Sequence, residues 1–174
     1  KHNYLVMKAS DIAPTIKEAF HIARTGRPGP VLVDIPKDVF NEEADFEYPT
    51  NVEKLPGYQN YGEVDEGEIQ KALQLIKESK KPLILAGHGI IISRAYKELR
   101  EFAEKAQIPV VTTLLGISSF PETHVLSVGM PGMHGAAYAS IAIDEADLLV
   151  ALGMRFDDRV VGRASDFSPK SKKI

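Results

Sequence analysis

The protein has 174 residues, of which 44% are hydrophobic and 26% charged, and its formal net charge is -3. This length suits one or two domains with a sizeable core, and the composition is ordinary for a globular protein. The charge balance gives no reason to expect nucleic acid as a partner. The lack of cysteine excludes disulfides and thiolate metal sites and fits a reducing compartment, and no apolar run approaches the length of a membrane span.

Residues 1–40 are predicted to form a helix followed by a strand. Ser10 or Asp11 can cap the helix, its apolar residues recur at helical spacing, and Gly26 ends it. The strand is predicted over residues 31–35, after a rigid turn rich in proline and glycine. One helix and one strand are too little for a domain, and the sequence starts with lysine rather than methionine. We therefore expect the chain to be part of something longer.

Residues 41–65 show neither helical nor strand periodicity, and their first part is acidic. So long a stretch without regular structure is uncommon inside a compact domain. We therefore predict an interdomain connector that lies against the protein surface through its larger apolar side chains, which are Phe46, Tyr48, Leu55 and Tyr58.

Helices and strands alternate in residues 66–174. The apolar spacing predicts helices around residues 69–80, 95–106 and 136–146, with Ser93 as the cap of the second, and strands at residues 83–86, 108–113 and 147–152. One helical turn is predicted within residues 114–121, and Ile174, after two lysines, is interpreted as the entry to a further strand. This alternation predicts an α/β fold with a doubly wound parallel sheet, which we expect to be truncated.

Three predicted strands end in loops with binding chemistry, at residues 87–89, 112–116 and 153–160. Because the carboxyl ends of parallel strands share one edge of the sheet, these loops fit a nucleotide cofactor laid along that edge. The glycine-rich loop of residues 129–135 precedes a helix, so its backbone amides could face an anion. Two alternatives remain open: the glycines serve only to turn the chain, and the charges at residues 155–159 pair only with each other.

No catalytic or metal-binding group is predicted. The Gly-x-Gly-x-x-Gly fingerprint is incomplete because Ile92 replaces its third glycine, so a standard NAD site is not expected. His88 and His134 are interpreted as structural or loop residues. Adjacent side chains usually point in different directions, so Asp157 and Asp158 are assigned a binding and orienting role rather than an acid/base role.

Three motifs carry a resemblance to thiamine-diphosphate-dependent enzymes. Residues 26–38, Gly-Arg-Pro-Gly-Pro-Val-Leu-Val-Asp-Ile-Pro-Lys-Asp, resemble the end of the N-terminal domain of this family. Residues 132–135, Gly-Met-His-Gly, and residues 153–160, Gly-Met-Arg-Phe-Asp-Asp-Arg-Val, are similar to the FAD-binding loops of its central domain. The first motif matches the acetohydroxyacid synthase (acetolactate synthase) catalytic subunits most closely but is shared widely among these enzymes, whereas the Arg-Phe-Asp-Asp-Arg string of the third motif is much more specific.

The resemblance implies a division into three parts. Residues 1–40 would be the C-terminal end of the N-terminal, pyrimidine-binding domain, and residues 41–65 the interdomain linker. Residues 66–174 would form most of a Rossmann-like central domain that binds FAD or a nucleotide and is incomplete at its C-terminus. The alternatives are the central domain of pyruvate oxidase, glyoxylate carboligase or a 2-oxoacid decarboxylase, and a non-catalytic nucleotide-binding scaffold.

The resemblance also implies an activity. Members of this family condense two pyruvates, or pyruvate and 2-oxobutyrate, with loss of carbon dioxide in branched-chain amino-acid synthesis. Thiamine diphosphate supplies the chemistry, and FAD is largely structural. The activating glutamate would lie before Lys1. The Gly-Asp-Gly signature that holds Mg²⁺ and the diphosphate would lie after Ile174, since none occurs in this sequence. The chain alone is therefore expected to be inactive.

Residue-by-residue matching to the family predicts two sets of site residues. The cofactor-binding set comprises Arg27, Gly87, His88, Gly89, Thr113, Leu114, Gly132, Met133, His134, Gly153, Arg155, Asp157, Arg159 and Val160. The set near the substrate and inhibitor channel comprises Lys37, Met133, Asp158 and Arg159. The chain departs from the family at His88, where a third glycine is usual, and at Pro131, where an apolar unbranched or leucine-like residue is common.

The resemblance further implies a homo-oligomer, either a dimer or a tetramer, and a separate regulatory subunit. It implies a cytoplasmic enzyme in a bacterium or archaeon, or an enzyme of an organellar stroma or matrix in a eukaryote. No membrane partner is expected.

Overall fold

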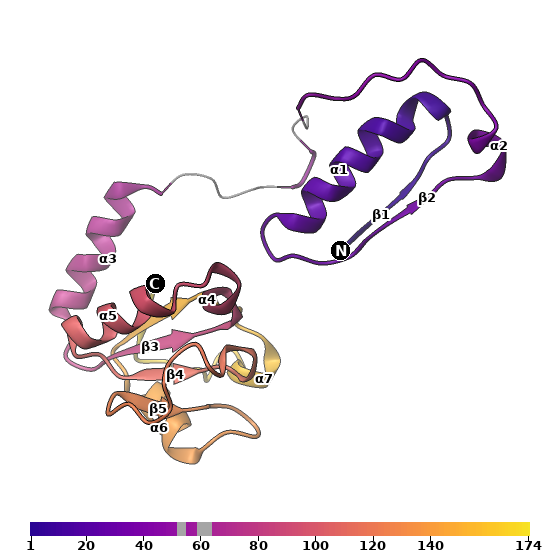
Figure 1. The fold of residues 1–174 in the computed structure, drawn as a ribbon. Coiled ribbons are helices and arrows are strands. Elements are labelled where there is room, and N and C mark those ends of the chain that lie inside the picture. Colours follow the sequence, from indigo (N-terminus) through magenta and orange to yellow (C-terminus); the bar gives the residue numbers. More distant parts are fainter. Residues whose placement is uncertain (52–54, 59–63) are drawn as a thin grey trace. The chain divides into compact units, whose positions relative to one another are not determined.

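The computed structural model describes residues 1–51, 55–58 and 64–174 and divides the chain into two compact units, Lys1–Glu63 and Val64–Ile174 (Figure 1). Each unit is described by itself. Within the described residues, no helix is both long enough and apolar enough to cross a membrane.

The first unit is a helix packed on two parallel strands. It consists of β1 (His2–Leu5), η1 (Ala9–Asp11), α1 (Ile12–Arg24), β2 (Val31–Asp34) and α2 (Lys37–Phe40). β1 and β2 pair in parallel, with His2 opposite Val31 and Leu5 opposite Asp34. The predicted helix and strand are confirmed, whereas β1 and α2 were not predicted.

The expected cap of α1 is wrong. Asp11 occupies the N-cap position, but its side chain caps no amide of the helix. The Ser10 hydroxyl instead lies 3.3 Å from Asp11 Oδ1, so the two polar side chains bond each other. The short helix η1 leads directly into α1 and brings the backbone into the helix without a side-chain cap.

The expected connector lies against the surface only in part. Phe46 is 78% exposed, which contradicts a packing role for that side chain. Tyr48 is also exposed, but its ring lies 4.8 Å from Lys17 Nζ in a cation–π contact. The Tyr58 hydroxyl bonds Thr25, directly after α1, so this residue does hold its segment in place. The remainder of the predicted connector, at residues 52–54 and 59–63, lies outside the described residues.

The second unit is built on a parallel sheet. Its strands are β3 (Pro82–Ala86), β4 (Val110–Thr112), β5 (Ser127–Gly129), β6 (Leu148–Leu152) and β7 (Lys172–Lys173), in the spatial order β5-β4-β3-β6-β7. From β3 the chain builds outward to β5 and then returns to the other side of β3 to form β6. This reversal confirms the doubly wound parallel sheet. β7 confirms the strand expected at Ile174, and β5 was not predicted.

Helices cover both faces of this sheet (Figure 1). They are α3 (Glu66–Glu78), α4 (His88–Ser93), α5 (Tyr96–Ala106), α6 (Ala137–Glu145) and α7 (Asp158–Val161), with the 3₁₀ turn η2 (Leu114–Gly116) after β4. Because successive strand residues point to opposite faces, Ile84 packs in a core cluster with Leu99 of α5, whereas Leu83 packs in one with Ile143 of α6.

The prediction for the segment after β3 is wrong in one respect. Gly87 to Gly89 was expected to be a loop and Ser93 the cap of the following helix, but α4 begins at His88 and Ser93 is its last residue. The Ser93 hydroxyl donates back to Gly89 O at 2.8 Å, and α5 begins only at Tyr96. Glycine has a low helix propensity, so a segment that contains it is expected to be a loop. The helical form found here depends on the backbone that packs against this segment.

Candidate functional site

The predicted binding loops meet where the strand order reverses, between β3 and β6. The two strands are in register, with Ala86 opposite Leu152. The Gly87 amide donates to Leu152 O at 2.9 Å and the Gly89 amide to Gly153 O at 2.7 Å, so the loops that follow these strands touch. In open α/β sheets, ligands bind outside the carboxyl ends of the strands at such a switch point.

Gly87, Gly89 and Gly153, which we call the glycine seam, pack against one another. A Cβ on Gly89 would lie 2.5 Å from the Cα of Gly153, and a Cβ on Gly87 would lie 2.5 Å from the oxygen of Gly153. Gly153 also has a φ of +62°, which L side chains rarely adopt. Matching to the family had placed all three glycines in the cofactor-binding set. The structure shows that their first effect is to let two loops of the protein approach each other.

The loop after β4 is attached to the same edge. The Thr113 amide donates to Ala86 O at 2.9 Å, and a Cβ on Gly116 would collide with that same carbonyl oxygen. His88 Nδ1 lies 2.8 Å from the carbonyl oxygen of Leu115, which joins α4 to η2. The side chains of Leu114 and Leu115 are exposed. This loop therefore offers apolar surface beside the switch point.

The loop of residues 129–135 lies against the segment that follows β6. Gly132 has a φ of +97°, and a Cβ there would lie 2.5 Å from the carbonyl oxygen of Arg159. The Gly135 and Ala136 amides donate to carbonyl oxygens of the same loop at 2.9 and 2.8 Å, and the Gly132 amide donates to Ser140 Oγ at 3.3 Å. These amides are thus used within the protein, and the anion site expected from this loop gains no support from them. Met133 and His134 are exposed.

Asp157 organises the charged segment after β6. Its Oδ1 accepts the Arg159 amide at 3.2 Å as the N-cap of α7, and its Oδ2 accepts from Arg155 Nε at 3.2 Å. Arg159 Nε lies 3.8 Å from Asp158 Oδ2. The arginine side chains nevertheless remain 69% and 72% exposed, so their guanidinium groups are open to an anionic ligand. Mutual pairing and ligand binding are therefore compatible here.

Arg27 and Lys37 belong to the first unit. Arg27 follows α1 in the turn before β2, and Lys37 is the first residue of α2; both are exposed. The remaining predicted site residues all belong to the second unit, and the loops that carry them converge on its strand ends.

The carboxylates with shifted pKa values lie away from these loops. The Ser79 hydroxyl and the amides of Lys80 and Lys81 hold the pKa of Asp147 below its usual value, and Asp147 precedes β6 at the opposite end of the strand. The hydrogen bond from Arg100 likewise lowers the pKa of Glu104 in α5. Within the described part of the chain, no group of three or more His, Cys, Asp or Glu could hold a metal ion.

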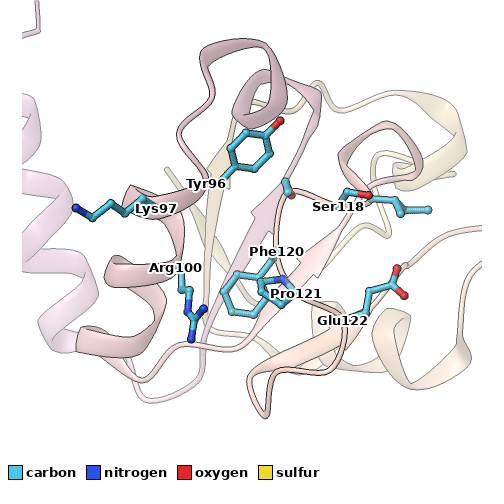
Figure 2. Close-up of a pocket in the computed structure, with 9 residues that line it drawn as sticks. Tyr96, Lys97, Arg100, Ser118, Phe120, Pro121 and Glu122 are labelled. Carbon is cyan, nitrogen blue, oxygen red and sulfur yellow. The ribbon is translucent and has the colours of Figure 1, made fainter.

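Two pockets were not anticipated from the sequence. The larger, of about 870 Å³, lies between α5 and residues 117–122 and is lined by residues that include Arg100 and Phe120 (Figure 2). Arg100 Nε already bonds Glu104 at 2.7 Å. The smaller pocket, of about 270 Å³, is lined by residues that include Ser140 and Val160 and adjoins the predicted cofactor-binding residues. Neither shows a sequence pattern, because each is lined by side chains from distant segments.

Comparison with known proteins adds independent evidence. Residues 69–174 match the family model described as thiamine pyrophosphate enzyme, central domain. Over its whole length the chain is 52% identical to the acetolactate synthase large subunit of Corynebacterium glutamicum, of which it covers 28%. It is 49% identical to the probable acetolactate synthase large subunit of Methanocaldococcus jannaschii, of which it covers 30%. It is 46% identical to the chloroplastic acetolactate synthase 2 of Nicotiana tabacum, of which it covers 26%.

The chain thus spans about a third or less of the length of these relatives. The matched region contains the whole sheet from β3 to β7, and with it the switch point, the glycine seam and the Arg155–Arg159 segment. The family match and the fold agree, and the chain therefore belongs to the thiamine pyrophosphate enzymes, with residues 69–174 corresponding to their central domain.

Proposed function

We propose that the chain is the FAD-binding part of an acetolactate synthase catalytic subunit. The single observation that carries this proposal is the convergence of the glycine seam, η2 and the Arg155–Arg159 segment on the switch point of the sheet. The resemblance of these loops to FAD-binding loops, and the names of the relatives, support the same assignment.

The chemistry of the edge fits a flavin nucleotide. Exposed guanidinium groups at Arg155 and Arg159 suit a diphosphate, because a guanidinium donates in a planar fork to phosphate oxygens. The exposed Leu114 and Met133 side chains suit the apolar rings of such a ligand. Asp157 holds Arg155 and starts α7, so it orients both arginines. Arg27 and the other matched residues are proposed to complete the site in the full-length protein.

In the proposed reaction, two pyruvates, or pyruvate and 2-oxobutyrate, are joined with loss of carbon dioxide. Thiamine diphosphate with Mg²⁺, when bound, would supply the electron sink for this chemistry. The residues of this chain would bind FAD and shape the substrate channel, for which we propose Lys37, Met133, Asp158 and Arg159. We further propose that residues 1–40, 41–65 and 66–174 are the end of the pyrimidine domain, a linker and the central domain. The full-length protein is proposed to be a homo-oligomer with a separate regulatory subunit, in the cytoplasm or in an organellar stroma or matrix.

The test uses the full-length protein purified by gel filtration. We expect flavin absorbance to co-elute with the protein and acetolactate to form from pyruvate only with added thiamine diphosphate and Mg²⁺. Arg155→Gln should weaken FAD binding by about tenfold or more, because it removes a charged donor. Arg163→Gln, four residues after the Arg155–Arg159 segment and also exposed, should leave FAD binding unchanged. A protein that carries no flavin would refute the cofactor assignment, and oxygen uptake with pyruvate but no acetolactate would favour a pyruvate oxidase.

A further inference from the structure

His88 joins two loops that come from different strands. It is the first residue of α4, directly after Gly87, and its ring lies against η2 after β4. The Nδ1 atom lies 2.8 Å from the carbonyl oxygen of Leu115, a distance typical of a hydrogen bond. A carbonyl oxygen can only accept, so Nδ1 must carry the proton and donate it.

Apart from the His88 contact, η2 is held mainly through its backbone. The side chains of Leu114 and Leu115 are exposed, so they contribute little packing toward the sheet. The Gly116 amide bonds Thr113 O at 2.7 Å, which closes the turn, and the Thr113 amide bonds Ala86 O at 2.9 Å, which ties the start of the turn to the end of β3. The backbone of Gly116 rests on the Ala86 carbonyl, which fixes one end of the turn. The hydrogen bond from His88 holds the carbonyl of Leu115, the residue before Gly116, and so attaches η2 to α4.

We propose that His88 is a positioning residue, which holds η2 in place through the Leu115 carbonyl and so presents Leu114 to the cofactor. Its role toward FAD rests on the proposed function, whereas its role toward η2 does not. A glycine at this position would have no donor side chain and would leave the Leu115 carbonyl to solvent.

The test compares His88→Ala with His88→Asn in the full-length protein. An asparagine amide can place an N–H donor near the position of Nδ1, so it is the conservative replacement. Hydrogen–deuterium exchange of residues 114–117 without added FAD should accelerate by about 3- to 10-fold in His88→Ala, the range expected for loss of one exposed hydrogen bond. His88→Asn should stay within about twofold of the unmodified protein. Ile92→Ala, on the same helix and also exposed, should change nothing at residues 114–117.

Unchanged exchange at residues 114–117 in His88→Ala would overturn the proposal, as would His88→Asn exchanging as fast as His88→Ala. Exchange at residues 79–81, around Asp147, reports whether the variants remain folded. In a second measurement, His88→Ala should release FAD about 3- to 10-fold faster and His88→Asn should not. Faster FAD release without faster exchange would mean direct contact instead of positioning. If the unmodified protein binds no FAD, the cofactor assignment fails, and the exchange data still decide the role of His88.

Discussion

Substitution of Gly153 by alanine tests whether the glycine seam holds the two strand ends together. At a φ of +62°, an added Cβ would lie 2.7 Å from Gly89 Cα and 2.8 Å from the Ile90 nitrogen. Both are backbone atoms, so no flexible side chain can move aside. The positive φ costs an L residue about 1–2 kcal/mol, and forcing atoms into a packed contact costs a further ~1–3 kcal/mol. We expect Gly153→Ala to lower the free energy of unfolding of the second unit by about 2–5 kcal/mol.

Gly129→Ala is the matched control. Gly129 also has a positive φ, +83°, but a Cβ there would meet only the Tyr138 side chain, at 3.6 and 3.8 Å, which are ordinary contacts. Its expected cost is therefore the conformational part alone, about 1–2 kcal/mol. The lower entropy of an unfolded chain with alanine in place of glycine affects both variants equally and cancels in their difference.

The assay is hydrogen exchange of the slowest amides of β6, because they report the opening free energy of this unit even if the rest of the protein unfolds separately. Gly153→Ala should increase exchange at β6 more than Gly129→Ala, by a factor that corresponds to at least about 1 kcal/mol. Equal effects of the two substitutions would show that the seam has room for a methyl group. The packing account of these glycines would then be wrong.

Three further predictions concern single side chains. Because the pKa of Asp147 is lowered in the folded protein, its carboxylate contributes stability that is complete above its ordinary value of 3.8 and is lost as the pH falls below it. The difference in melting temperature between the unmodified protein and Asp147→Asn should accordingly be constant at neutral pH and shrink in acid. Ser119 Oγ is buried and has no hydrogen-bond partner among the described residues, so Ser119→Ala should be neutral or should raise the unfolding free energy by up to about 1 kcal/mol in urea titrations; a loss above about 1 kcal/mol would contradict this. Asp157→Ser should keep the cap of α7 but lose the Arg155 contact, whereas Asp157→Ala should lose both. Exchange of the α7 amides should therefore rise in the alanine variant only, by about the factor that corresponds to ~1 kcal/mol.

The elements with strong periodicity were predictable. β3 and β6 read as apolar runs because both of their faces are covered, and α5 shows an apolar stripe because only one of its faces is. β1 and β5 were missed for a physical reason. Each is short and has no buried residue, so neither shows an apolar pattern. β1 pairs with a strand that is distant in the sequence, and β5 pairs with β4 in an irregular register.

The convergence of the binding loops was also predictable, because parallel strands bring their carboxyl ends to one edge. The sequence could not reveal which atoms those loops touch. The glycines of the seam were assigned to cofactor binding, and the structure adds that the space beside each of them is occupied by backbone of the opposite loop. The bond between His88 and Leu115 left no sequence signal either, because a histidine beside glycines is equally compatible with a bare loop.

The glycine seam also bears on when the site is assembled during folding. Its contacts join the first strand of the sheet to the fourth, and the chain between them must form β4, β5 and α6. Closing so long a loop is entropically costly, so such contacts tend to form late. A folding intermediate that contains only β3, β4 and α5 would still lack the sheet edge at which the predicted binding loops converge. We expect FAD added during refolding to bind only after the amides of β6 are protected from exchange. The proposed cofactor would then bind the folded sheet and would not accelerate its formation.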